Sequence, residues 1–542
     1  MKKYISALPV IILLAFAAGC NNDFMERVPP DKINDANFWK KPSDLKSYAN
    51  QFYPSLIDAN TFWRADNQSD NQCPSSLDGF IWGQYVVPSS GGGWAKSDWA
   101  QIRSCNYFLK QYRSVEGNPD EINTYVAEIY FFKAFFYYQK LRQFGDVPWL
   151  NDVLQINSEA LMAPRDSRKI VADSIAFYLD KAAGYLPDTS PEGRITRYAA
   201  LALKSRVCLF EGTYRKYRDL GDHEKMLQAS AAAALDVMSS SKFGVYTTGD
   251  AGSDYYNLFI AENLANNPEA IMVRTYATDK LMHNLNRILS EPQTGFSKDF
   301  AESYLCKDGK PIAVSPLYKG DAKFSDEFIN RDPRMLQTIY TADRPILVTA
   351  AGEARYQEVP EFNNQRCNTG YRIVKFYSPK ERDLEQGRSV KPVFVFRYSE
   401  VLLNYAEALA ELNSCTQAVL DESVNLLRAR VGMPKLKTEV GYTDPSWPKW
   451  EAAVSPLINE IRRERRVELA AEGFRFDDIR RWKAGVLLEN VKTYSGARDP
   501  QTNAYRALYP GNIRSWKNKL YLYPIPSIEL TLNPQIRQNP EW

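Results

Sequence analysis

The chain has 542 residues, with 68 Lys and Arg against 65 Asp and Glu, so its formal net charge is only +3. Hydrophobic residues make up 44% and charged residues 25%, which is typical of a globular protein and excludes a largely disordered chain. The near-neutral charge disfavours a nucleic-acid partner. The only two histidines, His223 and His283, are far apart in the sequence, which disfavours a multi-histidine metal site and His-dependent catalysis.

The first twenty residues predict export and anchoring. Lys2 and Lys3 precede an apolar stretch over 5–18, which has the length of a signal peptide and is short for a membrane span. Small residues directly before Cys20 resemble a bacterial lipoprotein processing site. We therefore expect a signal peptide over 1–19, acyl chains on Cys20 that hold the protein to a membrane, and a polar tether over 20–36. A plain secretory signal with an incidental Cys20 is the alternative.

The remaining cysteines are widely spaced and contain no Cys-x-x-Cys pair: Cys73, Cys105, Cys208, Cys306, Cys367 and Cys415. An exported protein is permitted disulfides, but this spacing does not specify a pairing. Free cysteines buried as small hydrophobic residues are at least as good an interpretation.

Helical periodicity dominates the chain up to about residue 240. Residues 120–144 contain nine aromatic residues around most of the helix circumference, so this helix should lie between other helices. Gly145 and Pro148 predict its end. Further helices are predicted over these ranges: 167–185, 196–211, 222–240, 397–412 and 416–431. Antiparallel helix pairs with small contact residues resemble tetratricopeptide units, and an irregular helical domain is the alternative.

Between 250 and 395 the helical pattern fades and turn signals multiply, such as Asp308-Gly309 and Asp332-Pro333. Alternating pieces at 372–377 and 393–398 predict short strands. The expected fold is therefore mainly α: tetratricopeptide-like repeats in a single globular body, with a loop-rich insertion containing short strands. Prolines at 524, 526, 534 and 540 predict an extended C-terminal segment rather than a helix.

Five longer motifs stand out along the chain: AEIYFFKAFFYYQKLRQFGDVPWL at 127–150, GRITRYAALALKSRVCLFEGT at 193–213, FRYSEVLLNYAEALAELN at 396–413, INEIRRERRVELAAEGFRFDDIRRWK at 458–483 and LYLYPIPSIELTLNPQIRQNPEW at 520–542. They resemble the SusD/RagB family of outer-membrane nutrient-uptake lipoproteins. The resemblance implies a SusD-like helical-repeat region over 37–245. It also implies a RagB/SusD C-terminal region over 246–542, with a loop-rich part (250–395), a helical part (396–483) and the extended segment (520–542).

The charged stretch over 458–473 combines apolar residues with Arg465, Glu468 and Glu472 on one side of a helix. An unpaired buried charge is costly, so we expect an ion network that joins this helix to the C-terminal segment. Carboxylates interleaved with arginines should be paired and ionised, which disfavours proton transfer and an enzymatic role. No cofactor is predicted. A structural Ca²⁺ in an acidic loop is left open, although no loop has EF-hand spacing.

Aromatic residues alternate with short polar residues in the loop over 60–100, and further aromatic residues follow in 276–330. Flat rings stack on the C–H faces of sugars while amides and carboxylates bond their hydroxyl groups. The candidate ligand-binding residues are Trp63, Asn67, Asp70, Trp82, Tyr85, Trp94, Tyr276, Tyr304 and Tyr318. For Trp63 a place in the core is the alternative. Gly91-Gly92-Gly93 lacks the Lys-Ser/Thr of a phosphate loop.

The family resemblance implies a non-catalytic receptor at the cell surface. It would be lipid-anchored in the outer membrane through Cys20, capture oligosaccharide, and deliver it to a SusC-like TonB-dependent transporter, with no nucleic-acid partner. The same receptor role with peptide cargo, as in the RagB-like branch, is an alternative. A surface glycoside hydrolase would need two carboxylates about 5–10 Å apart in a cleft, and no motif marks such a pair. A helical scaffold without a small ligand is the last alternative.

Overall fold

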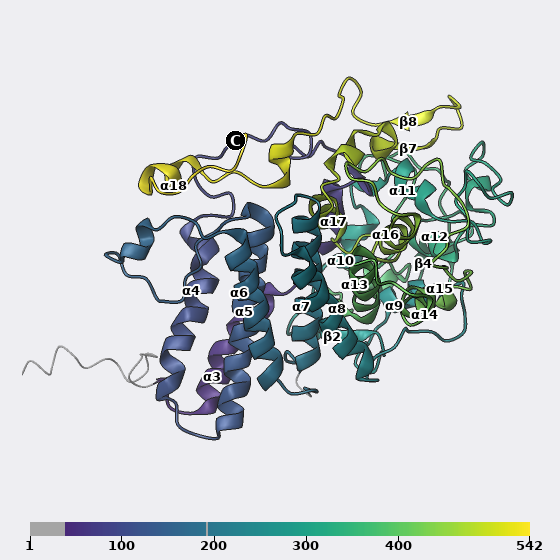
Figure 1. Cartoon of the computed structure of the whole chain (residues 1–542). Helices are drawn as coiled ribbons and strands as arrows, with labels where there is room; N and C mark the ends of the chain where they lie inside the picture. Colours follow the sequence, from purple (N-terminus) through teal and green to yellow (C-terminus); the bar gives the residue numbers. More distant parts are fainter. Residues whose placement is uncertain (1–37, 191–192) are drawn as a thin grey trace, which may run out of the picture.

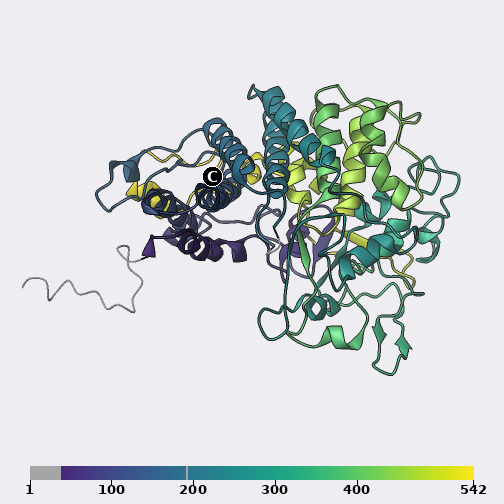
Figure 2. The same cartoon turned by 90° about the horizontal axis from the view of Figure 1, so that it is seen from below.

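The computed structural model describes residues 38–190 and 193–542. The predicted signal peptide, Cys20 and the tether to residue 36 lie outside the described residues. Figures 1 and 2 show a half built from long helices beside a half built mainly from loops and short helices. We call these the helical half and the loop-rich half. The C-terminal segment, yellow in Figure 1, runs across one end of both.

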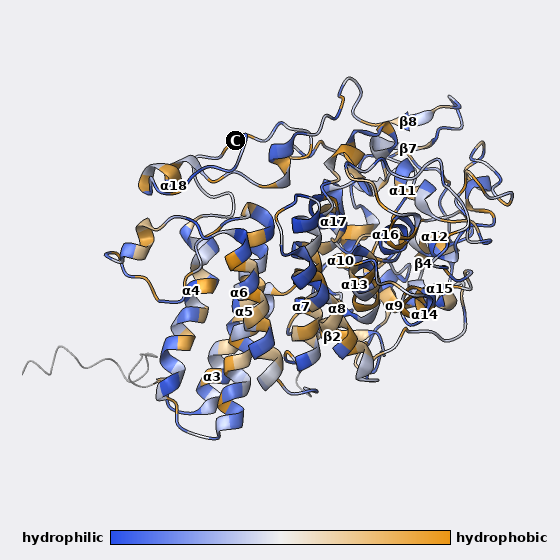
Figure 3. Ribbon diagram, viewed as in Figure 1, coloured by the Kyte–Doolittle hydropathy of each residue, from blue (hydrophilic) through white to orange (hydrophobic). Residues whose placement is uncertain are grey.

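Long helices form the helical half: α3 (Pro42–Ala49), α4 (Lys96–Gln111), α5 (Pro119–Phe144), α6 (Arg168–Tyr185), α7 (Arg197–Lys216) and α8 (His223–Ser239). Each of α4 to α8 packs on its neighbour in the chain. In Figure 3 the ribbon of α4 alternates between hydrophilic and hydrophobic residues, and its buried side chains Ile102, Cys105 and Phe108 recur at helical spacing. The predicted helical repeats are confirmed.

Helix α5 is the centre of the helical half. Asn118 caps its start by accepting from the backbone N–H of Asp120 (2.9 Å), and Gly145 ends it with φ +75°, a conformation that favours glycine. Most of its side chains from Tyr125 onward are buried. Helices α4 and α6 pack against it, so the all-round apolar pattern has the predicted cause.

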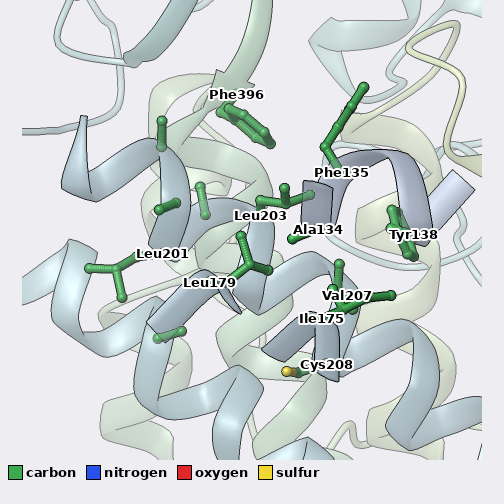
Figure 4. Packing of buried hydrophobic residues seen from close by; sticks show 14 of the residues in the cluster. Ala134, Phe135, Tyr138, Ile175, Leu179, Leu201, Leu203, Val207, Cys208 and Phe396 are labelled. Carbon is green, nitrogen blue, oxygen red and sulfur yellow. The ribbon is translucent and has the colours of Figure 1, made fainter. Parts of the chain in front are cut away.

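Small residues let the helices approach closely. Figure 4 shows Ala134 of α5 among Leu179 of α6 and Leu203 and Val207 of α7. Between α7 and α8 the contact is tighter still, because a Cβ on Gly212 would lie 2.8 Å from the side chain of Leu227. Interiors packed to this density tolerate neither added nor missing methylene groups.

The loop-rich half contains shorter elements. Its helices are α9 (Asp254–Ile260), α10 (Leu285–Ser290), α11 (Lys298–Ser303), α12 (Pro333–Thr338), α13 (Tyr398–Glu411), α14 (Gln417–Asp421), α15 (Val424–Arg430), α16 (Pro456–Glu468) and α17 (Arg475–Arg481). Helix α13 packs on α7 and α8 and also on α16, so it connects the two halves.

Short strands pair antiparallel in twos. The pairs are β1 (Gln72–Pro74) with β3 (Thr294–Phe296), β2 (Ala270–Arg274) with β6 (Val393–Arg397), β4 (Leu347–Val348) with β5 (Ala354–Arg355), and β7 (Ser495–Arg498) with β8 (Tyr505–Ala507). The strand predicted over 393–398 is confirmed as β6. The one predicted over 372–377 is wrong, because Ile373 makes only an isolated bridge and Phe376 turns the chain with φ +69°.

Two further predictions need correction. The helix expected over 416–431 is broken at Ser423, whose φ of −136° and ψ of −95° separate α14 from α15. The C-terminal segment is not extended throughout, because α18 (Ser527–Leu532) interrupts it. Pro526 stands directly before its first turn and therefore blocks no hydrogen bond within it.

The charged helix α16 carries the predicted ion network, but with other partners. Glu468 accepts from Arg334 (3.0 Å), Arg397 (2.9 Å) and Arg430 (2.6 Å), which come from α12, β6 and α15. Another ion pair of α16 joins Arg466 to Asp70 near the N-terminus (3.2 Å), and among the described residues no ion pair of α16 involves 520–542. Within the described residues the network therefore connects elements of the loop-rich half to one another and does not hold the C-terminal segment.

The six cysteines whose pairing the sequence left open all lie in the described part of the chain, and all six are free thiols. Burial raises the pKa of Cys73 and of Cys208 to about 12, so both stay protonated at neutral pH. No helix among the described residues is long and apolar enough to cross a membrane.

Candidate functional site

Trp63 and Tyr304, both predicted to contact ligand, lie inside the loop-rich half. Each is 0% exposed and belongs to the apolar core of that half. Trp63 donates from Nε1 to the carbonyl of Asn60 (3.2 Å), and the ring of Tyr304 packs edge-on against Phe300. Enclosed rings cannot stack on a sugar, so these two predictions are corrected. Large rings supply the buried area that a half with short helices needs.

Trp82 is also buried, with its ring covered by other side chains. The rings of Tyr494 and Tyr509 pack edge-on against it, each 5.3 Å away between centroids. The guanidinium of Arg514 lies 4.7 Å from its centroid. These three side chains together cover the ring, and Trp82 is only 9% exposed. The neighbouring Gly83 does not expose Trp82, and the predicted ligand contact is corrected.

Trp94 follows the glycine-rich loop and packs against Phe144, with 4.8 Å between centroids. Gly93 has φ +89°, and a Cβ there would lie 2.7 Å from the side chain of Gln143. Glycine therefore lets this loop close against α5, which buries Trp94 to 5% exposure. Its predicted ligand contact is corrected, because the glycines let the loop pack closely and do not expose Trp94 to a ligand.

Asp70 and Asn67 have structural partners. Asp70 is 1% exposed and pairs with Arg475 (2.7 Å) and Arg466 (3.2 Å). Burial opposes its ionisation, but these two guanidinium groups outweigh burial and hold the pKa of Asp70 well below its usual range. Asn67, half-buried, accepts from the hydroxyl of Thr294 (2.9 Å). Asp70 is corrected to a buried ion pair, while ligand contact by Asn67 stays a prediction.

Tyr85, Tyr276 and Tyr318 are half-buried, and each keeps part of its ring at the surface. Tyr85 packs edge-on against Phe80, and Tyr276 against His283 with 4.4 Å between centroids. Their ligand contacts stay predictions. Tyr318 differs from the other two because it lies three residues before Asp321, the centre of a group of charges and rings.

We name the contacting side chains Lys298, Asp321, Arg498 and Tyr505, together with Tyr318 and Phe324 of the loop that holds Asp321, the hairpin cluster, after the β7–β8 hairpin beside it. Its centre is Asp321, which accepts from the Tyr505 hydroxyl (2.6 Å) and pairs with Lys298 (2.7 Å) and Arg498 (3.1 Å). Arg498 belongs to β7 and Tyr505 to β8, so the hairpin brings both to the loop that holds Asp321. Figure 1 shows β7 and β8 above α11.

The ring of Tyr505 is held in place but not enclosed. Tyr505 is 37% exposed, with the Lys298 ammonium 5.0 Å and the Arg498 guanidinium 4.6 Å from its ring centroid. Tyr318 and Phe324 are half-buried. Flat rings held in one orientation offer stacking area to a ligand with little loss of side-chain entropy.

The charges of the hairpin cluster are stable over a wide pH range. Burial opposes ionisation of Asp321, but hydrogen bonds from Lys298 and Tyr505 hold its pKa below the usual range. Burial likewise opposes the charge of Lys298, and the carboxylates of Glu327 and Glu302 raise its pKa nonetheless. Neither group is poised for proton transfer near neutral pH, so the cluster is suited to binding and not to acid–base chemistry.

Tyr318 and Phe324 lie in the region that the sequence marked for ligand contact, whereas Tyr505 was missed. The available signal is local: Tyr505 follows the turn Asp499-Pro500 and precedes Pro510-Gly511, so a hairpin tip with an aromatic residue could have been read there. Its hydrogen bond to Asp321, which is distant in the chain, could not be predicted from the sequence.

Comparison with known proteins places both halves in one family. The model described as "SusD family" matches residues 290–542, and the one described as "Starch-binding associating with outer membrane" matches residues 29–209. The chain belongs to the SusD family. Two relatives from Formosa agariphila agree: SusD-like protein P2 is 25% identical, covering 99% of each chain, and SusD-like protein P38 is 23% identical, covering 90% of this chain and 93% of that one.

Solved structures of other SusD-like proteins have the same fold. A SusD-like protein of Bacteroides fragilis is 25% identical, with a TM-score of 0.75 over 95% of this chain and 100% of that one. A SusD-like carbohydrate-binding protein of the same species is 23% identical, with a TM-score of 0.71 over 92% and 100%. A laminarin-binding SusD-like protein is 21% identical, with a TM-score of 0.58 over 93% and 100%.

This SusD-family protein also has a cavity of about 450 Å³ between its halves, lined partly by carboxylates. Asp477 pairs with Arg142 (2.7 Å), and Glu472 with Arg397 (2.7 Å). Burial opposes the ionisation of Asp477, but its arginine neighbours outweigh this and lower its pKa to about 2. A general acid for glycoside hydrolysis needs a raised pKa, so these carboxylates are placed for pairing.

Proposed function

We propose that this chain is a non-catalytic, lipid-anchored receptor on the outer face of the outer membrane, which captures oligosaccharide and delivers it to a SusC-like TonB-dependent transporter. The observation that carries the glycan-binding part is the hairpin cluster. Its exposed ring and its paired charges combine the two kinds of group that carbohydrate recognition uses, an aromatic face and fixed hydrogen-bonding partners.

The family supports this proposal from two directions. The model matched by 29–209 is described as starch-binding and associated with the outer membrane. SusD-like neighbours carry the descriptions carbohydrate binding and laminarin binding. The leader and Cys20 add a route to the membrane surface through acyl chains.

Single-site affinity should be modest, with Kd roughly millimolar to micromolar, equivalent to about −4 to −8 kcal/mol. Rings of this size bury one or two sugar faces, and the hydroxyl groups exchange water bonds for protein bonds of similar strength. Holding the receptor beside a transporter raises the effective concentration of cargo there, so weak capture is sufficient for uptake.

Calorimetry of the purified protein against a panel of oligosaccharides tests the binding. For the bound member, Tyr505→Ala should raise Kd about tenfold or more by removing a stacking ring, whereas Tyr505→Phe should keep most of the affinity. Tyr185→Ala is the matched control, because Tyr185 is 55% exposed on α6, away from the cluster.

Other outcomes would redirect the assignment. Silence across the oligosaccharides with heat released by peptides would replace the cargo with peptide. Release of shorter sugars during incubation would make the protein a glycoside hydrolase. Equal effects of Tyr505→Ala and Tyr185→Ala would remove the hairpin cluster from ligand binding.

The anchoring and delivery steps need separate measurements. Cys20→Ser should move the protein from the outer-membrane fraction to a soluble fraction, because the acyl chains would have no attachment point. Co-purification of the anchored protein with a TonB-dependent channel tests delivery. An anchored protein that captures glycan but recovers no channel would limit the role to surface binding.

A further inference from the structure

We propose that the protein has a second carbohydrate site that takes acidic sugars, those carrying carboxylate or sulfate groups. This inference rests on the proposed function and narrows its ligand. The site is a cavity of about 510 Å³ between the segment 444–450 and the helices α11 and α16. We call it the tryptophan cavity, after Trp447 and Trp450 in its wall.

Hydrogen bonds to α16 fix the two indole rings, and each ring is partly exposed to solvent. Trp447 donates from Nε1 to Glu460 (2.8 Å), and Trp450 donates from Nε1 to Asn459 (2.6 Å). Glu460 and Asn459 are neighbours on α16, so one helix orients both rings. Both tryptophans are half-buried. Orientated rings at the wall of a cavity are a preformed surface for the apolar face of a sugar.

Arg462 places a positive charge behind one of these rings. Its guanidinium lies between Trp450 and Trp482, 4.4 Å from each ring centroid. Its Nη2 donates to the Tyr217 hydroxyl (2.6 Å) and to Glu411 (3.0 Å). Nε and Nη1 have no hydrogen-bond partner among the described residues. The guanidinium is therefore ion-paired with Glu411 but keeps two unpartnered N–H groups in a wall of the cavity.

The lining as a whole has more cations than carboxylates. Among the described residues the cations are Lys449, Arg462, Arg463, Arg466, Arg475 and Lys492, and the carboxylates are Asp70, Asp299, Glu302 and Asp444. Several pair with each other, such as Arg463 with Asp444 (2.5 Å) and Lys492 with Glu302 (2.7 Å). Lys449, between the tryptophans in the chain, is exposed. Arg462 and Arg463 also have carboxylate partners outside the lining, Glu411 (3.0 Å) and Glu460 (3.2 Å). Lys449 has no ion pair among the described residues, and its unpaired charge favours an anionic ligand over a neutral one.

The tryptophan cavity adjoins the hairpin cluster through one short helix. Lys298 of the cluster and the cavity residues Asp299 and Glu302 all belong to α11. Figure 1 shows α11 between β7 and α16. A single oligosaccharide that spans α11 would engage both sites, with neutral stacking at the cluster and its acidic groups in the cavity. Two linked contacts raise avidity beyond either alone.

Calorimetry with three hexasaccharides tests the inference: a galacturonic acid hexamer, a sulfated galactan hexamer and maltohexaose as the neutral probe. At least one acidic hexamer should bind more tightly than maltohexaose, and its affinity should fall as salt is raised from about 50 to 500 mM, because salt screens exposed charge. Lys449→Glu should weaken that acidic hexamer about tenfold, equivalent to ~1.4 kcal/mol, and leave maltohexaose unchanged.

Lys449 is exposed, so its reversal should leave the fold intact, as a matching thermal unfolding curve would show. Trp447→Ala is the second variant, and it should weaken the same acidic hexamer. The inference is overturned if no acidic hexamer exceeds maltohexaose, or if Lys449→Glu and Trp447→Ala both leave acidic binding unchanged. Maltohexaose binding that depends on Tyr505 would then keep the proposed function. Loss of all saccharide binding would remove both.

Discussion

The two halves of the molecule are stabilised by different means. In the helical half, long helices bury alanines and leucines against one another, as Ala134, Leu179 and Leu203 do. In the loop-rich half, the short helices α12 and α15 are held around α16 by the buried ion pairs of Glu468. Helices of six or seven residues have little stability of their own, so they depend on specific tertiary bonds.

The helical half is therefore stabilised mainly by buried apolar area, and the loop-rich half by interactions that require one geometry. Apolar contacts act in proportion to buried area and accept many arrangements, which suits regular helix pairs. Charge-assisted hydrogen bonds act only at one distance and angle, which suits loops that must keep one shape to hold the hairpin cluster and the tryptophan cavity. We expect mutations in the two halves to have correspondingly different signatures.

The largest effect should follow Glu468→Ala. It would leave Arg334, Arg397 and Arg430 without a buried carboxylate that all three share, and breaking such a network costs about 3–5 kcal/mol of unfolding free energy. Urea unfolding measures it. The control is Glu291→Ala, which breaks an exposed pair with Arg287 (3.2 Å) and should cost ~0.5 kcal/mol or less. Equal costs would show that the network contributes no more than a surface pair.

Next in size is Leu179→Ala in the helical half. Leu179 of α6 is 0% exposed and packs against the neighbouring helices. Removing three of its carbon atoms should lower the free energy of unfolding by ~3 kcal/mol, because apolar burial is lost and a cavity is left behind. Urea unfolding at low and high salt distinguishes the two mechanisms. The cost of Leu179→Ala should be independent of salt, and a strong salt dependence would contradict a purely apolar core.

Acid should weaken the protein through its ion pairs. Burial opposes ionisation of Asp477 and Glu407, but neighbouring arginines outweigh it and lower each pKa to about 2. Because the unfolded chain binds these protons more readily, the stabilisation is present above about pH 4.5 and is lost as the pH falls through 4 towards 2. The loss should be about 2 kcal/mol for Asp477 and about 3 kcal/mol for Glu407. Unfolding curves at pH 7, 5 and 3 measure the slope.

Asp477→Asn supplies the control for that slope. The variant should be less stable than the parent at pH 7 and should lose less stability between pH 5 and pH 3, because one of the titrating carboxyls is absent. Identical slopes for the two proteins would place the acid sensitivity elsewhere. Arg142 and Arg480 keep their charge over the whole range, so only the carboxylate titrates.

Helix positions were predictable because their signals are local. The range 120–144 agrees with α5 within one residue, since Asn118, Pro119 and Gly145 mark its ends in the sequence. The break at Ser423 was not predictable, because the apolar pattern continues across it. The ion network was predicted in kind, since buried charge demands pairing, but its partners Arg334 and Arg397 are distant in the chain and no local pattern names them.

The candidate site was harder to predict for the same reason. An aromatic residue beside glycine is compatible with display or with close packing, and only the tertiary fold decides. Trp82 and Trp94 are covered by residues from other segments, Tyr494 and Phe144. Tyr318 was named from its region, whereas Tyr505 reaches the same surface from a hairpin almost two hundred residues later.

The smallest effect should come from the cap of α16. Ser455 accepts through its hydroxyl from the backbone N–H of Ile458 (3.2 Å), which fixes the first turn of the helix that carries the network. Ser455→Ala should cost ~1 kcal/mol of unfolding free energy, while Ser455→Thr should cost little, because threonine keeps the oxygen. Urea unfolding of both variants checks this. A loss as large as that of Glu468→Ala would mean that the ion pairs form only when α16 begins at Ser455. The geometry of the loop-rich half would then be set by the start of this helix as well as by the ion pairs.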